Sequence, residues 1–220
     1  MTYTFPLTQA DLADLLKVES VAWNPLRQQE YSGLGNGDFL VHDLAPMLWE
    51  GECTTIQMYH ADAERIMARF NVLDGALQAF YMHNPAKAYP AGDPTGTLLS
   101  AANAAVTILA VGPDNKSIAF SGLPAWYMLT DGDLLAVDHG SPSRRALLQL
   151  VEGTAADGDG NTPLLEVRPH LRPGIVAGLP IQLSRPAAKV KVVPGTLRTE
   201  TTGALTSRIR FTVRQTLQAG

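Results

Sequence analysis

The sequence predicts a mainly β protein with one clear α-helix, and three observations support this. Its 19 glycines and 15 prolines nearly match its 17 basic and 21 acidic side chains in number, a composition typical of strands and turns. Turn sequences separate short apolar or alternating segments along most of the chain. Only one segment has strong helical periodicity.

The composition excludes several classes of protein. Hydrophobic residues make up 45% of the 220 positions and the net charge is −4, whereas disordered chains combine low hydrophobicity with high net charge. Charged residues make up 17%, against about a quarter in ordinary soluble proteins, so we expect partners to cover part of the surface. The single cysteine, Cys53, excludes a disulfide framework and a zinc site built mainly on thiolates.

No secretory signal or membrane-spanning segment is expected. The first 20 residues have no basic region and include Asp11 and Asp14, unlike a secretory signal. The most apolar stretch, Thr97 to Val111, has 15 residues and contains Ser100. A membrane span needs about 20 apolar residues, so we expect a soluble protein made in a reducing compartment.

The clearest helix is predicted over residues 60–75. Acidic residues lie in its first turn, which suits the helix dipole, and Gly75 suits a left-handed C-terminal cap. Its apolar residues recur at helical spacing: Ala63, Ile66, Met67, Phe70 and Leu73. A weaker helix is predicted over residues 9–17, where a strand is nearly as well supported.

Short strands are predicted for most of the remaining chain. Turn sequences occupy residues 33–38, 93–96, 112–115, 130–133, 157–161, 172–174 and 194–195. The last strand alternates most regularly, with Ile209, Phe211, Val213 and Leu217 on one face and Arg208, Arg210, Thr212, Arg214 and Thr216 on the other. Lys189 and Lys191 alternate with valines in the same way. If the two segments pair, one sheet face carries up to five positive charges.

The chain is predicted to form two domains. Between Pro90 and Pro173 it reads almost purely as strand and turn, whereas the strong helix and the most regular strand lie outside that region. A small barrel inserted into a discontinuous domain fits this arrangement.

Charge is divided along the chain. Residues 1–139 hold 6 basic and 16 acidic side chains, and residues 140–220 hold 11 basic and 5 acidic ones. The basic end could bind nucleic acid through Lys189, Lys191, Arg208, Arg210 and Arg214, or could contact an acidic face of another copy. In a third interpretation the two halves interleave and their charges mix. No aromatic residues interleave with these basic strands as stacking platforms would, which weakens the nucleic-acid interpretation.

Glu50 and Glu52 are candidates for a glycosidase acid pair. Both would face one side of a strand, about 7 Å apart by strand geometry. Nothing in the sequence places a sugar between them, so a solvated strand face or a subunit contact is the favoured interpretation.

Two loops resemble ligand-binding motifs and fail at diagnostic positions. Residues 157–162 start like a calcium loop with Asp157, Asp159 and Asn161, but Thr162 and Arg168 stand where that loop needs Gly and Glu. The glycine-rich residues 33–37 precede a strand-like run, whereas a phosphate cradle needs a helix there. A turn is the favoured interpretation of both, the second as a flexible or interface loop.

No catalytic or metal-binding set is predicted. The histidines are scattered, at positions 42, 60, 83, 139 and 170. Asp138, His139 and Ser141 place three triad residue types side by side, but neighbours on an extended segment point apart. Cys53 is expected to be a small buried apolar residue.

Taken as a whole, the sequence resembles the distal tail proteins of long-tailed bacteriophages and prophages, particularly those of alphaproteobacterial phages and gene-transfer agents. The resemblance lies in five stretches in order: QEYSGLGNGDFLVHDLAPMLWEG (29–51), LDGALQAFYMHNPAKAYPAGDPTG (73–96), GLPAWYMLTDGDLLAVDHG (122–140), LVEGTAADGDGNTPLLEVRPHLRPG (150–174) and PIQLSRPAAKVKVVPG (180–195). None of these is a catalytic signature. Their number and order carry the resemblance.

The resemblance implies a tail-tube-like β-sandwich or barrel domain, residues 1–92 and 178–220, with an inserted OB-like β-barrel at residues 93–177. It implies a structural virion protein, not an enzyme, with no cofactor and no membrane insertion. Six copies would form a ring that joins the tail tube to the tail tip or baseplate hub and lets DNA pass through its lumen. The expected partners are further copies of the chain, the tube, hub and tip proteins, and the tape-measure protein. The location would be the virion tail tip, assembled in the bacterial cytoplasm.

The resemblance also bears on single segments. Residues Gln29 to Leu40 would form a loop that reaches a neighbouring subunit. The alternative function is a host-glycan-binding or cell-wall-degrading tail-tip component. Trp126 and Tyr127 are the aromatic residues that could touch a glycan, and a place in the core is an equal alternative for them.

Overall fold

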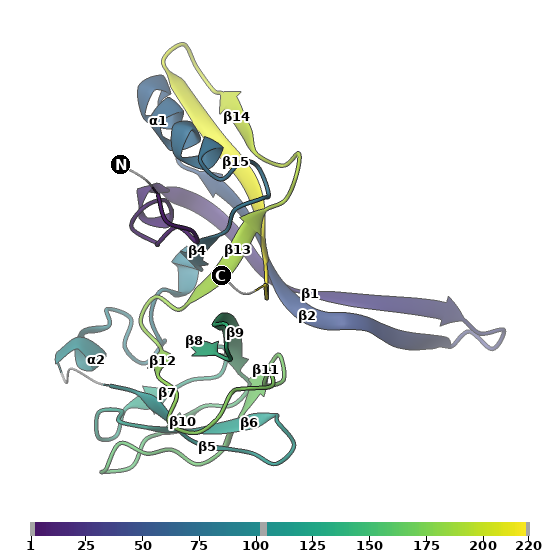
Figure 1. Ribbon diagram of the computed structural model, residues 1–220, viewed down its shortest axis with the longest axis vertical. Coiled ribbons are helices and arrows are strands. Elements are labelled where there is room, and N and C mark those ends of the chain that lie inside the picture. The colour runs from purple at the N-terminus through teal and green to yellow at the C-terminus, as the bar shows by residue number, and fades with distance from the viewer. Residues whose placement is uncertain (1–2, 102–104, 219–220) are drawn as a thin grey trace.

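The computed structural model describes residues 3–101 and 105–218 and confirms a mainly β protein (Figure 1). The first sheet contains β1 (Val18–Gly33), β2 (Phe39–Thr55), β3 (Met58–Tyr59), β4 (Phe80–His83), β13 (Ala187–Val192), β14 (Arg198–Thr201) and β15 (Thr206–Gln215). The second sheet contains β5 (Thr107–Val111), β6 (Ser117–Ser121), β8 (Leu134–His139), β9 (Arg144–Leu150), β11 (Leu165–Arg168) and β12 (Ile181–Gln182). A small two-stranded sheet pairs β7 (Met128–Leu129) with β10 (Thr154–Ala155).

The helices are α1 (His60–Asn71), the short α2 (Thr97–Ala101), and the 3-10 helices η1 (Ala13–Leu15) and η2 (Pro85–Lys87). The strong helix prediction is therefore confirmed. The helix ends four residues before Gly75, which has a φ of +70° in the following turn. Residues 9–17 form turns and η1 rather than an α-helix or a strand.

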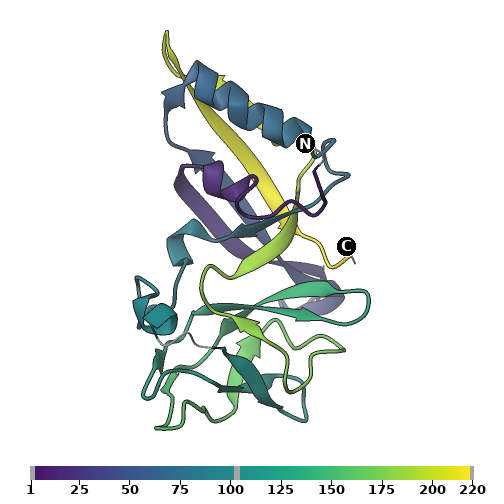
Figure 2. The ribbon, with the colours of Figure 1, turned by 60° about the vertical axis from the view of Figure 1, so that its left-hand side comes forward.

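The first sheet has the order β1-β2-β15-β13-β4, and β15 also pairs with β3 and β14. Helix α1 lies against β15 (Figures 1 and 2). The aromatic ring of Phe70 on α1 packs 5.0 Å from that of Phe211 on β15 and 6.3 Å from that of Phe80 on β4. This contact covers one face of the sheet and forms the first hydrophobic core.

The predicted alternation of the last strand is confirmed. Ile209, Phe211 and Val213 are buried in the first core. The two basic segments pair as expected, because β13 is antiparallel to β15 with Lys191 opposite Arg214. Leu217 lies beyond the end of β15.

The second sheet is barrel-like, as the sequence predicts. Its strand order is β12-β8-β9-β11-β6-β5, and its two ends meet through backbone hydrogen bonds. The amide of Ile108 donates to the carbonyl of Leu179 at 2.9 Å, and the amide of Ile181 donates to the carbonyl of Val106, also at 2.9 Å. The apolar stretch Thr97 to Val111 is divided between α2 and β5, and its residues 102–104 lie outside the described part of the chain.

Strands β8 and β9 are buried on both faces. Along β8, Leu134 and Ala136 belong to the first core, while Leu135 and Val137 belong to the core of the barrel. Leu147 and Leu148 on β9 divide in the same way. This burial explains the consecutive apolar residues at 134–137 in β8 and 146–148 in β9. The domain boundaries after residue 92 and before residue 178 stay a prediction, and the first core extends across them.

Polar contacts also join the two sheets. The indole Nε1 of Trp49 on β2 donates to the carbonyl of Leu147 on β9 at 2.9 Å. The guanidinium of Arg145 on β9 lies 4.4 Å from the ring centroid of Tyr81 on β4, and its Nε donates to Asp138 Oδ1 at 2.7 Å. The barrel is thus fixed to the first sheet by packing, hydrogen bonds and a cation–π contact.

Candidate interaction surfaces

Glu50 and Glu52 lie on β2 beside β15. Nε and Nη2 of Arg214 donate to Glu50 Oε2 at 2.8 and 2.7 Å, and Glu52 is exposed. The register places Glu50 opposite Arg214 and Glu52 opposite Thr212. Glu50 thus serves the pairing of two strands, which agrees with the interpretation as a strand face.

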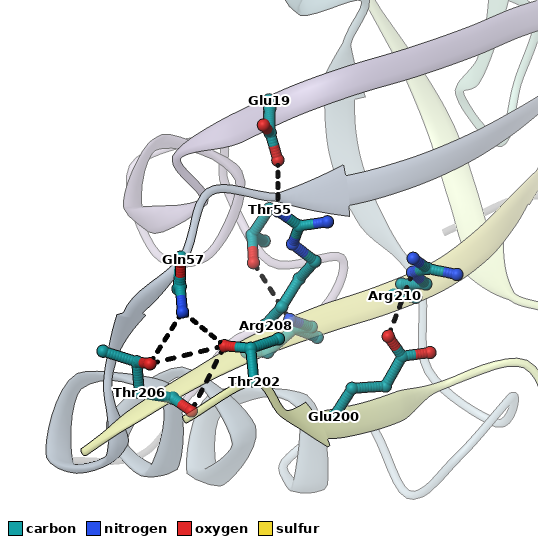
Figure 3. Close-up of polar contacts among 9 residues, drawn as sticks. Glu19, Thr55, Gln57, Glu200, Thr202, Thr206, Arg208 and Arg210 are labelled. Atoms are coloured by element: carbon teal, nitrogen blue, oxygen red, sulfur yellow. Dashed lines mark hydrogen bonds and ion pairs between the residues drawn. The ribbon is translucent and has the colours of Figure 1, made fainter. Parts of the chain in front are cut away.

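The arginines of the basic face of β13 and β15 are paired with acidic residues of the same chain. Arg208 pairs with Glu19 at 2.9 Å, and Arg210 pairs with Glu200 at 3.3 Å (Figure 3). With Arg214 bound to Glu50, all three arginines of the predicted face have a carboxylate partner. This agrees with the interpretation in which the charges of the two halves mix, because the fold places acidic residues beside the arginines. A contact of this face with another copy stays a prediction.

The two lysines of this face are also engaged. Nζ of Lys189 donates to the carbonyl of Gln218 at 3.1 Å, and Nζ of Lys191 donates to Oε1 of the same residue at 3.2 Å. Lys189 is only 6% exposed, and burial, followed by the charge of Lys191, lowers its pKa. A nucleic-acid interface along these strands would have to displace these contacts.

A hydroxyl and amide cluster fixes the turn between β14 and β15 and was not predicted. Nε2 of Gln57 donates to Oγ1 of Thr202 and Thr206, both at 2.8 Å (Figure 3). The hydroxyl of Thr55 accepts from the amide of Ile209 at 3.0 Å, and His60 Nδ1 lies 2.7 Å from Ser207 Oγ. The threonine-rich segment 196–206 was the only signal, and it has no spacing that identifies a partner.

The calcium-like segment is a turn, as the sequence indicates. Oδ1 of Asp157 accepts from the amides of Asp159 at 3.0 Å and Asn161 at 2.8 Å, so this carboxylate stabilises its own loop. Among the described residues, no group of three or more His, Cys, Asp or Glu side chains is arranged to hold a metal ion.

The residues of the apparent triad do not converge. Asp138 is bound by Arg145, and His139 is buried, which lowers its pKa and favours the neutral imidazole. Cys53 is 2% exposed, and burial raises its pKa to about 12, which confirms it as a buried thiol. A thiol in this state is not a nucleophile near neutral pH.

The outer part of the β1–β2 hairpin, residues 28–45, is exposed along nearly its whole length, and we call it the arm. It belongs to the first sheet but projects beyond the other strands of that sheet and away from the second sheet (Figure 1). The arm corrects the expectation of a loop at Gln29 to Leu40, because its strands pair from Gln29 opposite Asp43 to Gly33 opposite Phe39. The glycine-rich residues form the turn at its tip, where the amide of Leu34 donates to the carbonyl of Asp38 at 2.7 Å.

The arm exposes apolar side chains on both faces. Tyr31 is opposite Val41, and Phe39 is two residues away on the same face. Tyr31 is 77% exposed and Phe39 is 61% exposed. Leu40, on the other face, is 63% exposed. Within the described residues, β1 pairs only with β2, so its outer edge is open.

The two candidate aromatic residues of the barrel differ in exposure. Tyr127 is 3% exposed in the barrel core, and burial raises its pKa. Trp126 is 73% exposed and has a φ of +60°, a conformation that is unusual for a bulky residue. Of these two residues, Tyr127 therefore lies in the core, whereas Trp126 is exposed to solvent.

Comparison of the chain with known protein families and with curated proteins gives no match. The described helices include none with the length and apolar character needed to cross a membrane. The geometry of the chain itself therefore carries the functional argument.

Proposed function

We propose that the chain is a structural, non-enzymatic tail protein that forms a ring of six copies between the tail tube and the tail tip of a long-tailed phage particle. The arm is the single observation that supports this most. It combines an open strand edge with apolar side chains on both faces, and such a surface fits contact with another protein chain.

The arm cannot derive much stability from the rest of its own chain. A two-stranded hairpin is marginally stable in water unless a third strand or a packed surface covers it. In a ring, each arm would lie on the next copy, whose contacting surface is a different one. Head-to-tail contacts of this kind produce a closed ring when the rotation between neighbouring copies brings the last copy back to the first.

The distribution of charge also supports an apolar contact between copies. Four of the described ion pairs join an acidic residue before position 140 to an arginine after it: Asp14–Arg185, Glu19–Arg208, Glu50–Arg214 and Asp138–Arg145. Many of the opposite charges of the two parts of the chain thus pair within one molecule. The exposed arm then offers a better contact than the basic strands.

In this role the partners are further copies, the tube, hub and tip proteins and the tape-measure protein, with DNA passing through the lumen in transit. The location is the virion tail tip, after assembly in the bacterial cytoplasm. These assignments come from the resemblance of the five sequence stretches.

Light scattering and electron microscopy test the ring. The expected particle has about six times the 23.6 kDa mass of one chain, alone or after mixing with the tube or hub protein. A variant in which Tyr31 and Phe39 are both replaced by serine is expected to remain folded and monomeric. Wild-type protein that stays monomeric and binds neither tail partner would contradict the proposal.

A second candidate function is binding of a host glycan by the barrel. The exposed indole of Trp126 favours it, because a flat aromatic ring that is not used in a core can stack on a sugar. Binding to purified capsule or wall polysaccharide that is lost in Trp126→Ala, but kept in Trp126→Phe, would support it. No binding by the wild-type protein would exclude it.

A further inference from the structure

A cleft lies where the arm meets the barrel, and we call it the junction cleft. It measures about 440 Å³. One wall is formed by Asp43 at the base of the arm and by Arg27 and Met47 just beyond it. The other is the end of β11 and the segment after it, with Arg168, His170 and Arg172. A ligand in this cleft would touch both the arm and the barrel.

The junction cleft gathers positive charge in a protein with an excess of acid. Three guanidinium groups line it against one carboxylate, and Oδ1 of that residue, Asp43, accepts from Gln29 Nε2 at 2.7 Å. Arg168 is paired with Glu166. Arg27 and Arg172 have no carboxylate within ion-pair distance among residues 3–101 and 105–218.

The twelve arginines of the chain divide into two groups by ion pairing. Seven arginines of the described residues form ion pairs: Arg65, Arg145, Arg168, Arg185, Arg208, Arg210 and Arg214. Five others form none within the described part of the chain, and two of these five, Arg27 and Arg172, lie in one cleft, while Arg69, Arg144 and Arg198 do not. Because neither guanidinium has an acidic partner in the described part of the chain, an anion bound in this cleft would gain a charge-assisted hydrogen bond from either of them.

Arg172 is held in place to receive such an anion. Its Nη2 donates to the carbonyl of Met47 at 2.9 Å, which fixes the guanidinium between the barrel and the arm. Burial without an acidic partner lowers its pKa. A guanidinium has five N–H donors, and within residues 3–101 and 105–218 one of those of Arg172 has a partner, which leaves the others to a ligand.

We infer that the junction cleft binds an oxyanion, a carboxylate or a phosphate, through Arg27 and Arg172. The planar fork of a guanidinium matches both groups and can bind them through two parallel hydrogen bonds. The remaining lining includes Leu44, Pro46 and Pro169, which suits a ligand with apolar atoms beside its charge. Because the walls belong to different sheets, the bound anion would also fix the arm relative to the barrel.

Calorimetric titration at low salt tests the inference with two probes. One is inorganic phosphate, and the other is a short peptide that alternates leucine and glutamate and is capped at both ends. Saturable binding of both probes, in competition, identifies a general oxyanion site. Binding of the peptide alone or of phosphate alone assigns the source of the anion, and no binding of either probe overturns the inference.

Charge-matched variants separate the site from general electrostatic attraction. Arg172→Gln and Arg27→Gln are each expected to weaken binding about tenfold, since one hydrogen bond to a charged group accounts for such a change. Arg198→Gln removes the same charge from an exposed position on β14 and is the control, with no change expected. An equal loss in all three variants overturns the inference. Arg27 is exposed, so its variant keeps the test valid if Arg172→Gln does not fold.

The outcome is independent of ring formation. A chain that forms rings but binds neither probe would refute the junction cleft and leave the proposed function intact. A chain that binds an anion in the cleft, but forms no ring and binds no tail partner, would support the junction cleft and contradict the proposed function.

Discussion

Arg145 offers the sharpest test of how the barrel is fixed to the first sheet. Its guanidinium binds Asp138 through Nε and Nη2 and stacks 4.4 Å from the ring centroid of Tyr81. Asp138 lies on β8 of the barrel, whereas Tyr81 lies on β4 of the other sheet. Arg145→Ala therefore removes an ion pair and an inter-sheet contact together.

The magnitude follows from these two contacts. A hydrogen bond to a charged group contributes about 1.5–3 kcal/mol, but the side chain of Asp138 is 42% exposed, so water replaces part of the loss. The cation–π contact adds about 0.5–2 kcal/mol. We expect the free energy of unfolding to fall by about 2–3 kcal/mol, which corresponds to about 4–12 °C in Tm for a chain of this size.

Urea and thermal unfolding measure this change. Arg65→Ala is the matched control, because Arg65 forms an exposed pair with Asp62 at 3.9 Å. Its loss should cost less than about 0.5 kcal/mol. The reasoning is refuted if Arg145→Ala costs no more than Arg65→Ala. Arg145→Lys keeps the positive charge but loses the planar guanidinium, so its loss in the free energy of unfolding should lie between those of Arg145→Ala and Arg65→Ala.

Three further predictions concern a thiol, a turn and the arm. Burial raises the pKa of Cys53 from 9.0 to about 12, so above pH 9 the unfolded chain loses a proton that the native state keeps. The free energy of unfolding should therefore fall by up to about 1.4 kcal/mol per pH unit between these values, and a comparison of pH slopes with Cys53→Ala measures this. Gly160→Ala should destabilise by about 3 kcal/mol, since its φ is +77° and a Cβ would meet the Leu123 carbonyl oxygen at 2.0 Å. Gly37→Ala is the control, because Gly37 has a φ of +86° but open space around a Cβ, and it should cost about 1 kcal/mol. If urea unfolding gives the same loss of stability for Gly160→Ala and Gly37→Ala, the steric argument is wrong. The double variant Tyr31→Ser and Phe39→Ser should change the unfolding free energy by less than about 1 kcal/mol while weakening self-association by at least tenfold in sedimentation. A parallel loss of folding and association would mean that the arm packs on its own chain.

Sequence periodicity predicted the regular elements well. The helix over residues 60–75 and the alternation of Ile209, Phe211 and Val213 follow from spacing alone, because each element buries one face. The turns at residues 33–37 and 157–161 follow from the conformational preferences of Gly, Asn and Asp. Cys53 was predicted to be buried for its small apolar character.

The candidate surfaces were less predictable. A loop was expected in place of the arm, because the glycine-rich residues at its tip disfavour regular structure. The hairpin forms because the strands on both sides of the tip pair with each other, and that pairing is not visible in the tip residues. The sequence left open whether the charges of the basic strands meet acidic residues of the same chain. Glu19 and Glu50, the partners of Arg208 and Arg214, are more than 150 residues away in sequence. No local pattern encodes a pairing of that separation.

The sequence by itself determined that this protein is mainly β, that its one long helix lies between residues 60 and 75, and that charge is divided near residue 140. Tertiary structure decided the rest. It brought acidic strands beside basic ones, buried β8 and β9 on both faces, and left the arm and the junction cleft exposed. The physical reason is that burial and charge compensation depend on which strands become neighbours, and that choice is made by the packing of the whole chain.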